Sequence, residues 1–162
     1  MSRTIQIAPV RKTVVVEASA RRAFDVFTAG IDRWWPKGHG IGATPVKRSV
    51  IEPFVGGRWF TTCEDGTDVV VGHIQAWQPG ERFVLSWEIN AKWKPDAHLE
   101  LASEVEVRFH SEGPARTRVE LEHRNFERMG AEAGESMRAN VDGGWPGLLA
   151  LYTKHANEEG QS

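Results

Sequence analysis

The sequence predicts an α+β domain in which one long C-terminal helix packs on a curved antiparallel sheet. Most of the chain alternates apolar and polar residues with a period of two, and turns rich in glycine or proline divide this pattern into short segments. Near the C-terminus the period changes, and the apolar residues Trp145, Leu148, Leu149, Tyr152 and Ala156 fall on one helical face. Because each expected strand has one polar face, we expect the helix to cover the other face and complete a two-layer domain.

The expected strands each place one set of side chains inward. Residues 82–89 show this most clearly, because Phe83, Leu85, Trp87 and Ile89 share one face and the residues between them share the other. Short turns join successive strands, so we expect antiparallel pairing. The seven predicted strands are residues 10–17, 46–52, 58–63, 68–77, 82–89, 100–110 and 116–124.

Two short helices are expected after the first strand. Ser19 is a suitable N-cap for a helix over residues 20–28, because its hydroxyl can accept a hydrogen bond from a free backbone N–H. A second helical turn, residues 31–35, ends at Pro36, since proline disfavours a helical conformation in the residue before it. Residues 36–44 contain three glycines and a proline, which predicts a loop.

The apolar stripe of the C-terminal helix extends backwards to Val141 and Met137. Pro146 interrupts the pattern, because proline in a helix interior removes one backbone hydrogen bond and costs about 3 kcal/mol. We therefore expect the helix to kink or to begin near Pro146, with residues 125–135 as a link before it. The two glycines that precede Trp145 are expected to let the helix approach the sheet closely.

Length and composition indicate one folded domain. A chain of 162 residues, 40% hydrophobic and 26% charged, is long enough to bury a core. We expect a lead-in at residues 1–9, a single domain at 10–158 and a tail at 159–162. A formal net charge of −2 gives no electrostatic basis for binding nucleic acid or an anionic membrane.

The single cysteine, Cys63, excludes an internal disulfide and fits a reducing compartment. The N-terminal residues contain no apolar stretch typical of a signal peptide. No apolar run approaches the roughly 20 residues that span a bilayer. We therefore expect a cytoplasmic protein with no membrane contact.

Several motifs, taken in chain order, carry a family resemblance. They are Trp34-Trp35-Pro36, Glu52-Pro53-Phe54-Val55-Gly56-Gly57-Arg58-Trp59, Gly72-His73-Ile74, Pro79-Gly80-Glu81-Arg82-Phe83-Val84-Leu85-Ser86-Trp87, Leu121-Glu122-His123 and Gly144-Trp145. Over roughly residues 10–157 the chain resembles the START-like (SRPBCC, Bet v-like) helix-grip superfamily. Within it, the chain is most similar to the branch named after the activator of the heat-shock protein 90 ATPase. The resemblance implies a seven-stranded sheet that grips the C-terminal helix, with a cavity between them.

This resemblance implies a fold more firmly than it implies one function. Relatives in the superfamily include lipid carriers, hormone receptors, cyclases and co-chaperone domains. The same fold thus serves several activities, and the function has to be argued from the residues of the site.

Aromatic residues are the main candidates for a binding site. The chain has seven Trp and seven Phe but one Tyr, and several Trp in a small domain often line a cavity or an interface. One interpretation is a pocket for an apolar or aromatic molecule under the helix, and the alternative is an ordinary aromatic core. Trp34, Trp35 and Trp93 are expected at the mouth of the pocket or in a separate cluster over a sheet edge. The full set of candidates is Trp34, Trp35, Trp59, His73, Trp77, Phe83, Trp87, His123, Trp145, Leu149 and Tyr152.

The sequence contains no recognisable catalytic or metal-binding motif. None of the six histidines has a metal-ligand spacing such as HExxH, and neither a nucleophile elbow nor a phosphate-binding loop is present. His123 alternates with inward residues, and the face of His73 depends on the strand register, so either is a candidate acid or base. A lone inward histidine is more often a core group with satisfied hydrogen bonds. We therefore predict no catalytic residue, metal or cofactor, and favour a binding protein over an enzyme.

The carboxylates alternate onto the outer face of the last two strands. Glu104, Glu106, Glu120 and Glu122 accompany basic residues there, which predicts cross-strand charge pairs on a solvated surface rather than an active site. The basic residues are Arg108, Arg116, Arg118 and Arg124.

Three functional hypotheses follow from these patterns. The first is a domain that binds a hydrophobic or aromatic small molecule between the sheet and the C-terminal helix. The second is a cyclase- or hydrolase-like enzyme that uses a pocket histidine, His73 or His123. The third is an interaction module that contacts a chaperone or a second copy of the chain, which predicts a sizeable exposed apolar patch.

Overall fold

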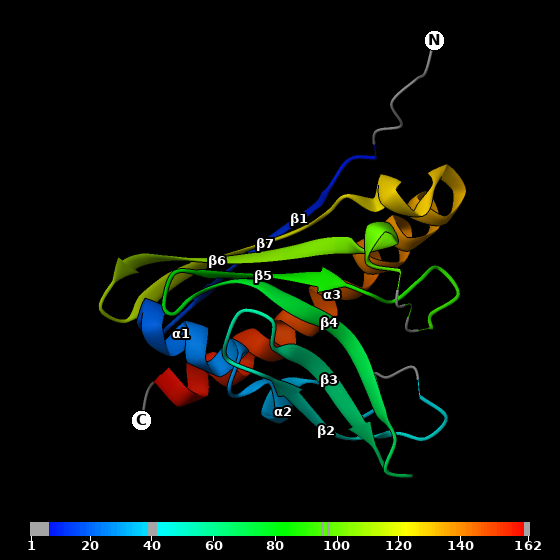
Figure 1. Ribbon diagram of the computed structural model, residues 1–162. Coiled ribbons are helices and arrows are strands. Elements are labelled where there is room, and N and C mark those ends of the chain that lie inside the picture. The colour runs from blue at the N-terminus through cyan, green and yellow to red at the C-terminus, as the bar shows by residue number, and fades with distance from the viewer. Residues whose placement is uncertain (1–6, 39–41, 95, 97, 161–162) are drawn as a thin grey trace.

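An antiparallel sheet curls around one long helix in the computed structural model (Figure 1). The structure describes residues 7–38, 42–94, 96 and 98–160, without the side chains of 99, 159 and 160, so part of the predicted loop at 36–44 lies outside the described residues. Within them, seven strands pair in the order β1-β7-β6-β5-β4-β3-β2, which confirms the predicted sheet. The strands are β1 (Val10–Val16), β2 (Val46–Ile51), β3 (Arg58–Cys63), β4 (Asp68–Gln78), β5 (Arg82–Trp87), β6 (Ser103–Gly113) and β7 (Arg116–Arg124).

The short helices α1 (Ala20–Phe27) and α2 (Ile31–Trp34) connect β1 to β2, as predicted. The hydroxyl of Ser19 caps α1 by accepting a hydrogen bond from the backbone N–H of Arg22 at 3.1 Å. α1 buries Phe24 and Phe27 against the concave side of the sheet, where their rings meet Phe83. The helices therefore close one end of the space between the sheet and the C-terminal helix.

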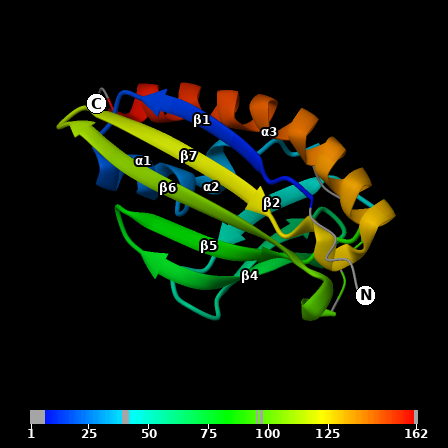
Figure 2. The ribbon, with the colours of Figure 1, turned by 90° about the horizontal axis from the view of Figure 1, so that it is seen from above.

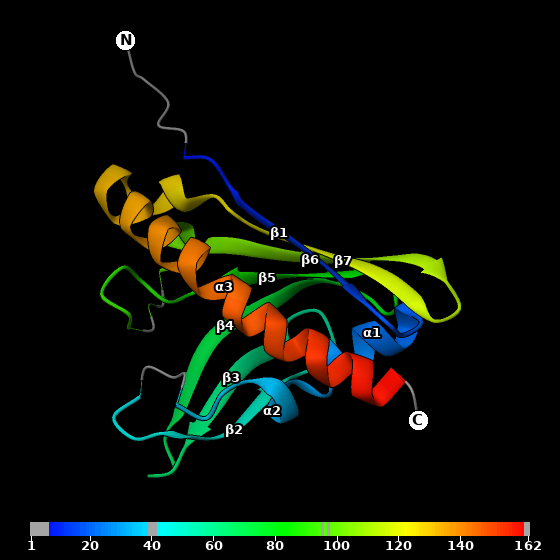
Figure 3. The ribbon, with the colours of Figure 1, turned by 180° about the vertical axis from the view of Figure 1, so that it is seen from behind.

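Helix α3 (Ala131–Gly160) lies along the concave side of the sheet as one unbroken ribbon (Figures 2 and 3). It does not begin at Pro146, so the expectation of a helix start there was wrong. Residues 125–135 also form less of a link than predicted, because the 3-10 helix η2 (Phe126–Met129) and the first turn of α3 fall within them. The reason lies in tertiary packing. Met137, before Pro146, and Tyr152, after it, are both buried, and their burial offsets the backbone hydrogen bond that proline cannot donate.

The close approach expected at the two glycines before Trp145 occurs elsewhere. A Cβ atom on Gly143 or Gly144 would meet nothing within 4 Å, so these glycines do not bring the helix nearer to the sheet. A Cβ atom on Gly72 in β4 would instead overlap the carbonyl oxygen of Ser86 in β5. Only glycine fits at that point of the sheet.

The convex face carries the predicted charge pairs, but one of its carboxylates is buried. Glu106 is 3% exposed. It accepts hydrogen bonds from Arg82 at 2.8 Å, from Arg108 at 3.2 Å and from Arg124 at 2.6 Å. The expectation of a solvated surface was thus wrong at Glu106, because the aliphatic stems of long arginine side chains can cover a carboxylate.

Candidate ligand-binding site

Five tryptophans form a continuous aromatic row that leads from α2 across the concave face to α3. The ring centroids lie 5.7 Å apart for Trp34 and Trp35, and 5.0 Å apart for Trp35 and Trp59. The row continues to Trp87 at 6.1 Å and then to Trp145 at 6.0 Å. All five side chains are buried, so Trp34 and Trp35 belong to the interior rather than to a separate cluster at a sheet edge.

His123 of β7 lies beside the end of this row, and both of its ring nitrogens are engaged. Trp145 Nε1 donates a hydrogen bond to Nδ1 at 3.2 Å, so Nδ1 carries no proton. Nε2 therefore holds the proton and donates it to the Ser103 hydroxyl at 2.8 Å. Complete burial, next to the rings of Trp87 and Phe126, lowers the pKa of His123 to about 3. The imidazole is consequently neutral and a weak base, and it orients Trp145.

Two indole N–H groups in the row have no hydrogen-bond partner among the described residues. They belong to Trp59 and Trp87, whose side chains are 1% and 5% exposed. A buried donor without an acceptor costs about 1–3 kcal/mol. Of the two, Trp87 also borders both cavities described below and Trp59 borders neither, so the Trp87 N–H is the donor that can hold an acceptor oxygen of a bound molecule.

A small cavity, here called the helix-side cavity, opens between the end of β5 and α3. Its volume is about 50 Å³. Trp93 reaches it from the loop after β5 with a backbone φ of 59°, an uncommon conformation for a large residue. The side chain of Asn90 holds that loop by accepting hydrogen bonds from the backbone N–H groups of Lys92 and Lys94. The lining residues are Trp87, Trp93, Asn140, Val141, Gly144, Trp145 and Leu148.

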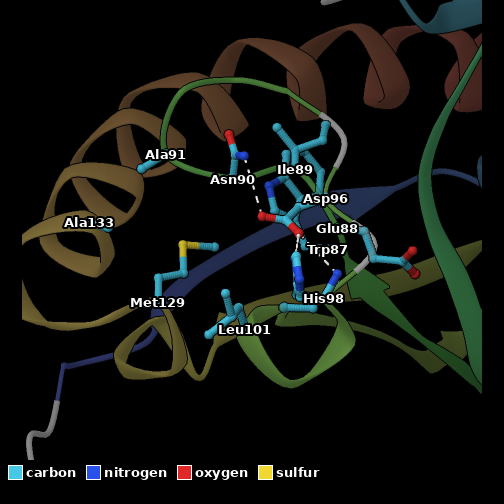
Figure 4. Close-up of a pocket in the computed structure, with 11 residues that line it drawn as sticks. Trp87, Glu88, Ile89, Asn90, Ala91, Asp96, His98, Leu101, Met129 and Ala133 are labelled. Carbon is cyan, nitrogen blue, oxygen red and sulfur yellow. Dashed lines mark hydrogen bonds and ion pairs between the residues drawn. The ribbon is translucent and has the colours of Figure 1, made fainter.

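A second cavity of about 80 Å³, here called the loop-side cavity, shares Trp87 with the first (Figure 4). It lies among the end of β5, the 3-10 helix η1 (Leu99–Leu101), η2 and the start of α3. Its walls are mainly apolar, with Asn90, Asp96 and His98 as a connected polar group (Figure 4). The lining residues are Trp87, Glu88, Ile89, Asn90, Ala91, Asp96, His98, Leu101, Ala102, Met129 and Ala133.

The cavities are small compared with an aromatic ligand. Each is below the roughly 150 Å³ of an apolar cavity that holds benzene. Trp87 contributes to the walls of both. An extended aromatic molecule would therefore have to occupy both spaces and displace the Trp87 side chain.

The remaining aromatic candidates lie in a second part of the interior, around the phenylalanines of α1. Phe24 lies 5.0 Å from Trp77, and Phe27 lies 5.5 Å from Phe83 and 4.8 Å from Tyr152, measured between ring centroids. The Tyr152 hydroxyl donates to the carbonyl oxygen of Ala23 at 2.8 Å, and burial raises the pKa of Tyr152. Leu149 is also buried. Trp77, Phe83, Leu149 and Tyr152 border neither of the two cavities.

His73 lies on the opposite face of the sheet from His123. Its Nδ1 is 2.6 Å from Glu88 Oε2, and the Ser86 hydroxyl donates to the same oxygen. The neighbouring Ile74 points into the core, and a register shift between Ile74 and Ala76 sets this orientation. The structure thus separates His73 from the other candidates. Because the carboxylate stands between the serine and the histidine, the trio lacks the serine–histidine contact of a nucleophilic triad.

Sequence reasoning missed several residues that line the cavities, namely Asn140, Gly144, Asp96, His98 and Met129. The Asp-x-His spacing was visible in the sequence, but many surface turns share it. Among the described residues, no group of His, Cys, Asp and Glu side chains is arranged to hold a metal ion. The described part of the chain also contains no helix long and apolar enough to cross a membrane.

The fold and these motifs agree with a family comparison. The family described as "Activator of Hsp90 ATPase homolog 1-like protein" matches residues 17–152. The chain belongs to this family. The predicted family resemblance and helix-grip fold are thereby confirmed. No curated protein matches the chain.

Three solved structures illustrate the range of similar proteins. An anthrahydroquino-gamma-pyrone synthase, Txn09, solved in complex with SUM, is 39% identical, with 92% of this chain and 97% of that chain covered and a TM-score of 0.65. CalC from Micromonospora echinospora, a self-sacrificing resistance protein, is 29% identical, with 94% and 96% covered and a TM-score of 0.69. The Aha1 dimer from Colwellia psychrerythraea is 14% identical, with 93% and 97% covered and a TM-score of 0.64, a likeness of fold alone.

Proposed function

We propose that the chain binds a flat, polycyclic aromatic molecule with keto or hydroxyl oxygens between the sheet and α3. The observation that carries this proposal is the buried indole N–H of Trp87, which borders both cavities and has no hydrogen-bond partner among the described residues. Aromatic walls favour stacking with a flat ligand, and a few donors in such walls select a ligand with acceptor oxygens. The name of the 39% identical synthase specifies a product of this class, which supports the proposal.

In this proposal the ligand enters through the helix-side cavity, which Trp87, Trp93 and Trp145 line. Gly144 lines the helix-side cavity, and a Cβ atom there would meet open space, so the wall of the helix is recessed at this point. A ligand would join the two cavities by moving Trp87. The unpartnered indole of Trp87 would lose no hydrogen bond to described residues in that movement.

A synthase or cyclase reaction in the same site is the second candidate function. It is supported by the 39% identity to a synthase over 92% of this chain. His123 argues against the version in which a buried histidine is the base, because its pKa is about 3 and both of its nitrogens are already bonded. In the remaining version, the dry aromatic walls would fold a flexible substrate and bring its reacting atoms together.

Contact with a chaperone or with a second copy of the chain stays a prediction. The exposed large apolar side chains among the described residues come from separate elements, β1, the β2–β3 turn, η1 and α3. They are Val15, Phe54, Val55, Leu101 and Leu151. Of these, two are adjacent in sequence, so the described surface offers no specific argument for a partner protein.

Two glycine variants of α3 test the binding site. Alizarin (1,2-dihydroxyanthraquinone) serves as the probe, and its binding is followed by quenching of tryptophan fluorescence. Gly144→Leu fills the helix-side cavity and should weaken binding by roughly tenfold or more, equivalent to about 1.4 kcal/mol. Gly143→Leu is the matched control, because it also gains a side chain in open space but does not line the cavity. Absence of saturable quenching in the unmodified protein, or equal effects of the two variants, would contradict the proposal.

Two tryptophan variants test the role of the indole N–H. Trp87→Phe keeps an aromatic ring and removes the donor, so alizarin should bind about fivefold more weakly, because one hydrogen bond contributes about 1 kcal/mol net. Trp77→Phe, at a half-buried ring that borders neither cavity, should leave the affinity unchanged. Equal affinities of these two variants would argue that the Trp87 N–H does not contact the ligand.

A further inference from the structure

The loop-side cavity contains a histidine whose ring is oriented by a fixed carboxylate. We propose that His98 holds a phenolate or enolate oxygen of the aromatic ligand, with Asp96 as its positioning residue. This inference rests on the proposed function and adds to it a polar contact that selects ligands with an acidic hydroxyl group.

Hydrogen bonds from His98 and Asn90 fix the carboxylate of Asp96. Its Oδ1 lies 2.6 Å from His98 Nδ1 and accepts the backbone N–H of His98 at 2.9 Å. Its Oδ2 accepts a hydrogen bond from the side-chain amide of Asn90 at 3.4 Å. These bonds lower the pKa of Asp96, the backbone hydrogen bond from His98 being the largest cause, so the carboxyl is ionised at neutral pH. An ionised carboxylate requires a proton on Nδ1, which leaves Nε2 to face a ligand.

Nε2 of His98 has no hydrogen-bond partner among the described residues, and the side chain is 71% exposed. Beside it the cavity presents apolar surface from Leu101, Met129 and Trp87 (Figure 4). A flat ligand that stacks on these apolar groups would bring a polar edge to the imidazole. His98 thus differs from His123, whose nitrogens are both occupied inside the core.

The charges around His98 favour its protonated form. The hydrogen bond and charge of Asp96, followed by the charge of Glu100, raise the pKa of His98. Glu88 also lines the cavity, but its carboxylate bonds His73 and Ser86 on the other face of the sheet. From the opposite side, η2 and α3 contribute the uncharged Met129 and Ala133 to the wall. The nearby cation on η2, Arg128, donates to the carbonyl oxygen of Ala102.

The proton balance of the contact is simple. In one charge state, neutral His98 accepts at Nε2 the proton that a ligand hydroxyl loses, which forms an imidazolium–phenolate pair. In the other, His98 is already protonated and donates Nε2–H to the phenolate oxygen. Both end in the same pair, so the ligand hydroxyl should ionise at a lower pH when bound than when free.

Alizarin tests this inference, because its absorbance moves to longer wavelength when a phenolic proton is lost. In the unmodified protein, bound alizarin should ionise at least about one pH unit below free alizarin, since an opposite charge within contact shifts a pKa by about 1–3 units. His98→Gln should return the ionisation close to the free value while quenching shows that alizarin still binds. Asp96→Asn should give an intermediate shift.

His110→Gln is the matched control, because His110 is another histidine beside a carboxylate, 3.3 Å from Glu120 on β7. It should leave the ionisation of bound alizarin unchanged. Equal titrations of the His98→Gln variant and the unmodified protein would overturn the assignment of His98 while leaving ligand binding intact. Failure of the unmodified protein to bind alizarin would overturn both proposals, and the quenching measurement separates that outcome from the first.

Discussion

His123 and Glu106 are buried ionisable side chains on opposite faces of the sheet, and the two faces hold them in opposite charge states. His123 on the concave face is 0% exposed and Glu106 on the convex face is 3% exposed. Desolvation lowers the pKa of His123 to about 3, so the imidazole is neutral at pH 7. Burial alone would raise the pKa of Glu106, but hydrogen bonds and charges from Arg108, Arg124 and Arg82 outweigh it and lower the pKa to about 2.

The difference shows that burial does not set the charge of a group without reference to its partners. His123 meets a hydroxyl and an indole, which satisfy a neutral ring but do not compensate a charge. Glu106 meets three guanidinium groups that are themselves partly exposed, so its charge is paired and hydrogen-bonded. The concave face therefore holds His123 without charge, and the convex face joins the strands through charge.

Truncation of the aromatic row should have the largest effect on stability. Trp145→Ala removes a buried indole, opens a cavity and frees His123 Nδ1, so the free energy of unfolding should fall by about 3–5 kcal/mol. Urea denaturation at pH 7 measures this change. Trp145→Phe is the control and should lose less, because it retains most of the ring. If the alanine variant loses less free energy of unfolding than the phenylalanine variant, the volume filled by the Trp145 ring does not stabilise the fold.

The neutral state of His123 predicts a pH dependence of stability. Between pH 6.5 and about 3 the unfolded chain binds a proton that the folded state excludes, so this contribution is complete above pH 6.5 and is lost as the pH falls. The slope is about 1.4 kcal/mol per pH unit, which amounts to roughly 2 kcal/mol between pH 6.5 and 5. Urea denaturation at both pH values should show that His123→Gln flattens the dependence and that His110→Gln preserves it. A similar slope in both variants would mean that His123 is not the group responsible.

Removal of the convex carboxylate should have a smaller effect. Glu106→Gln leaves three arginines without their central charge, and the free energy of unfolding should fall by about 1.5 kcal/mol, because water can solvate the exposed guanidinium groups. The loss should shrink in 1 M salt, since screening reduces the charge contribution. A loss that salt does not change would indicate packing rather than charge as the role of Glu106.

An exposed pair on the same convex face should contribute least. Arg11 is 74% exposed and lies 2.8 Å from Glu122. Arg11→Ala should change the free energy of unfolding by no more than about 0.5 kcal/mol, because solvent screens such pairs. A loss of unfolding free energy as large as that of Glu106→Gln would show that solvent exposure does not reduce the contribution of the Arg11–Glu122 pair.

The sequence determined much of the fold through local periodicity. Alternation in β5 placed Phe83, Leu85 and Trp87 inward, and the helical spacing placed Trp145 and Tyr152 on the buried face of α3. These patterns are readable because burial of one face imposes a period of two on a strand and of 3.6 on a helix. His123 could be placed inward for the same reason, although its partners could not be named.

Tertiary contacts determined other features of the fold and the site, which a periodic pattern of apolar residues cannot predict. A register shift placed His73 on the convex face, and packing on both sides of Pro146 kept α3 continuous. The burial of Glu106 required arginines from three strands, and the two cavities form where the end of β5 and the loop after it lie against α3, with Trp87 in the walls of both. Each of these features depends on contacts between residues far apart in the chain. Such contacts stabilise the structure only once the chain has folded, and they produce no periodic pattern in the sequence.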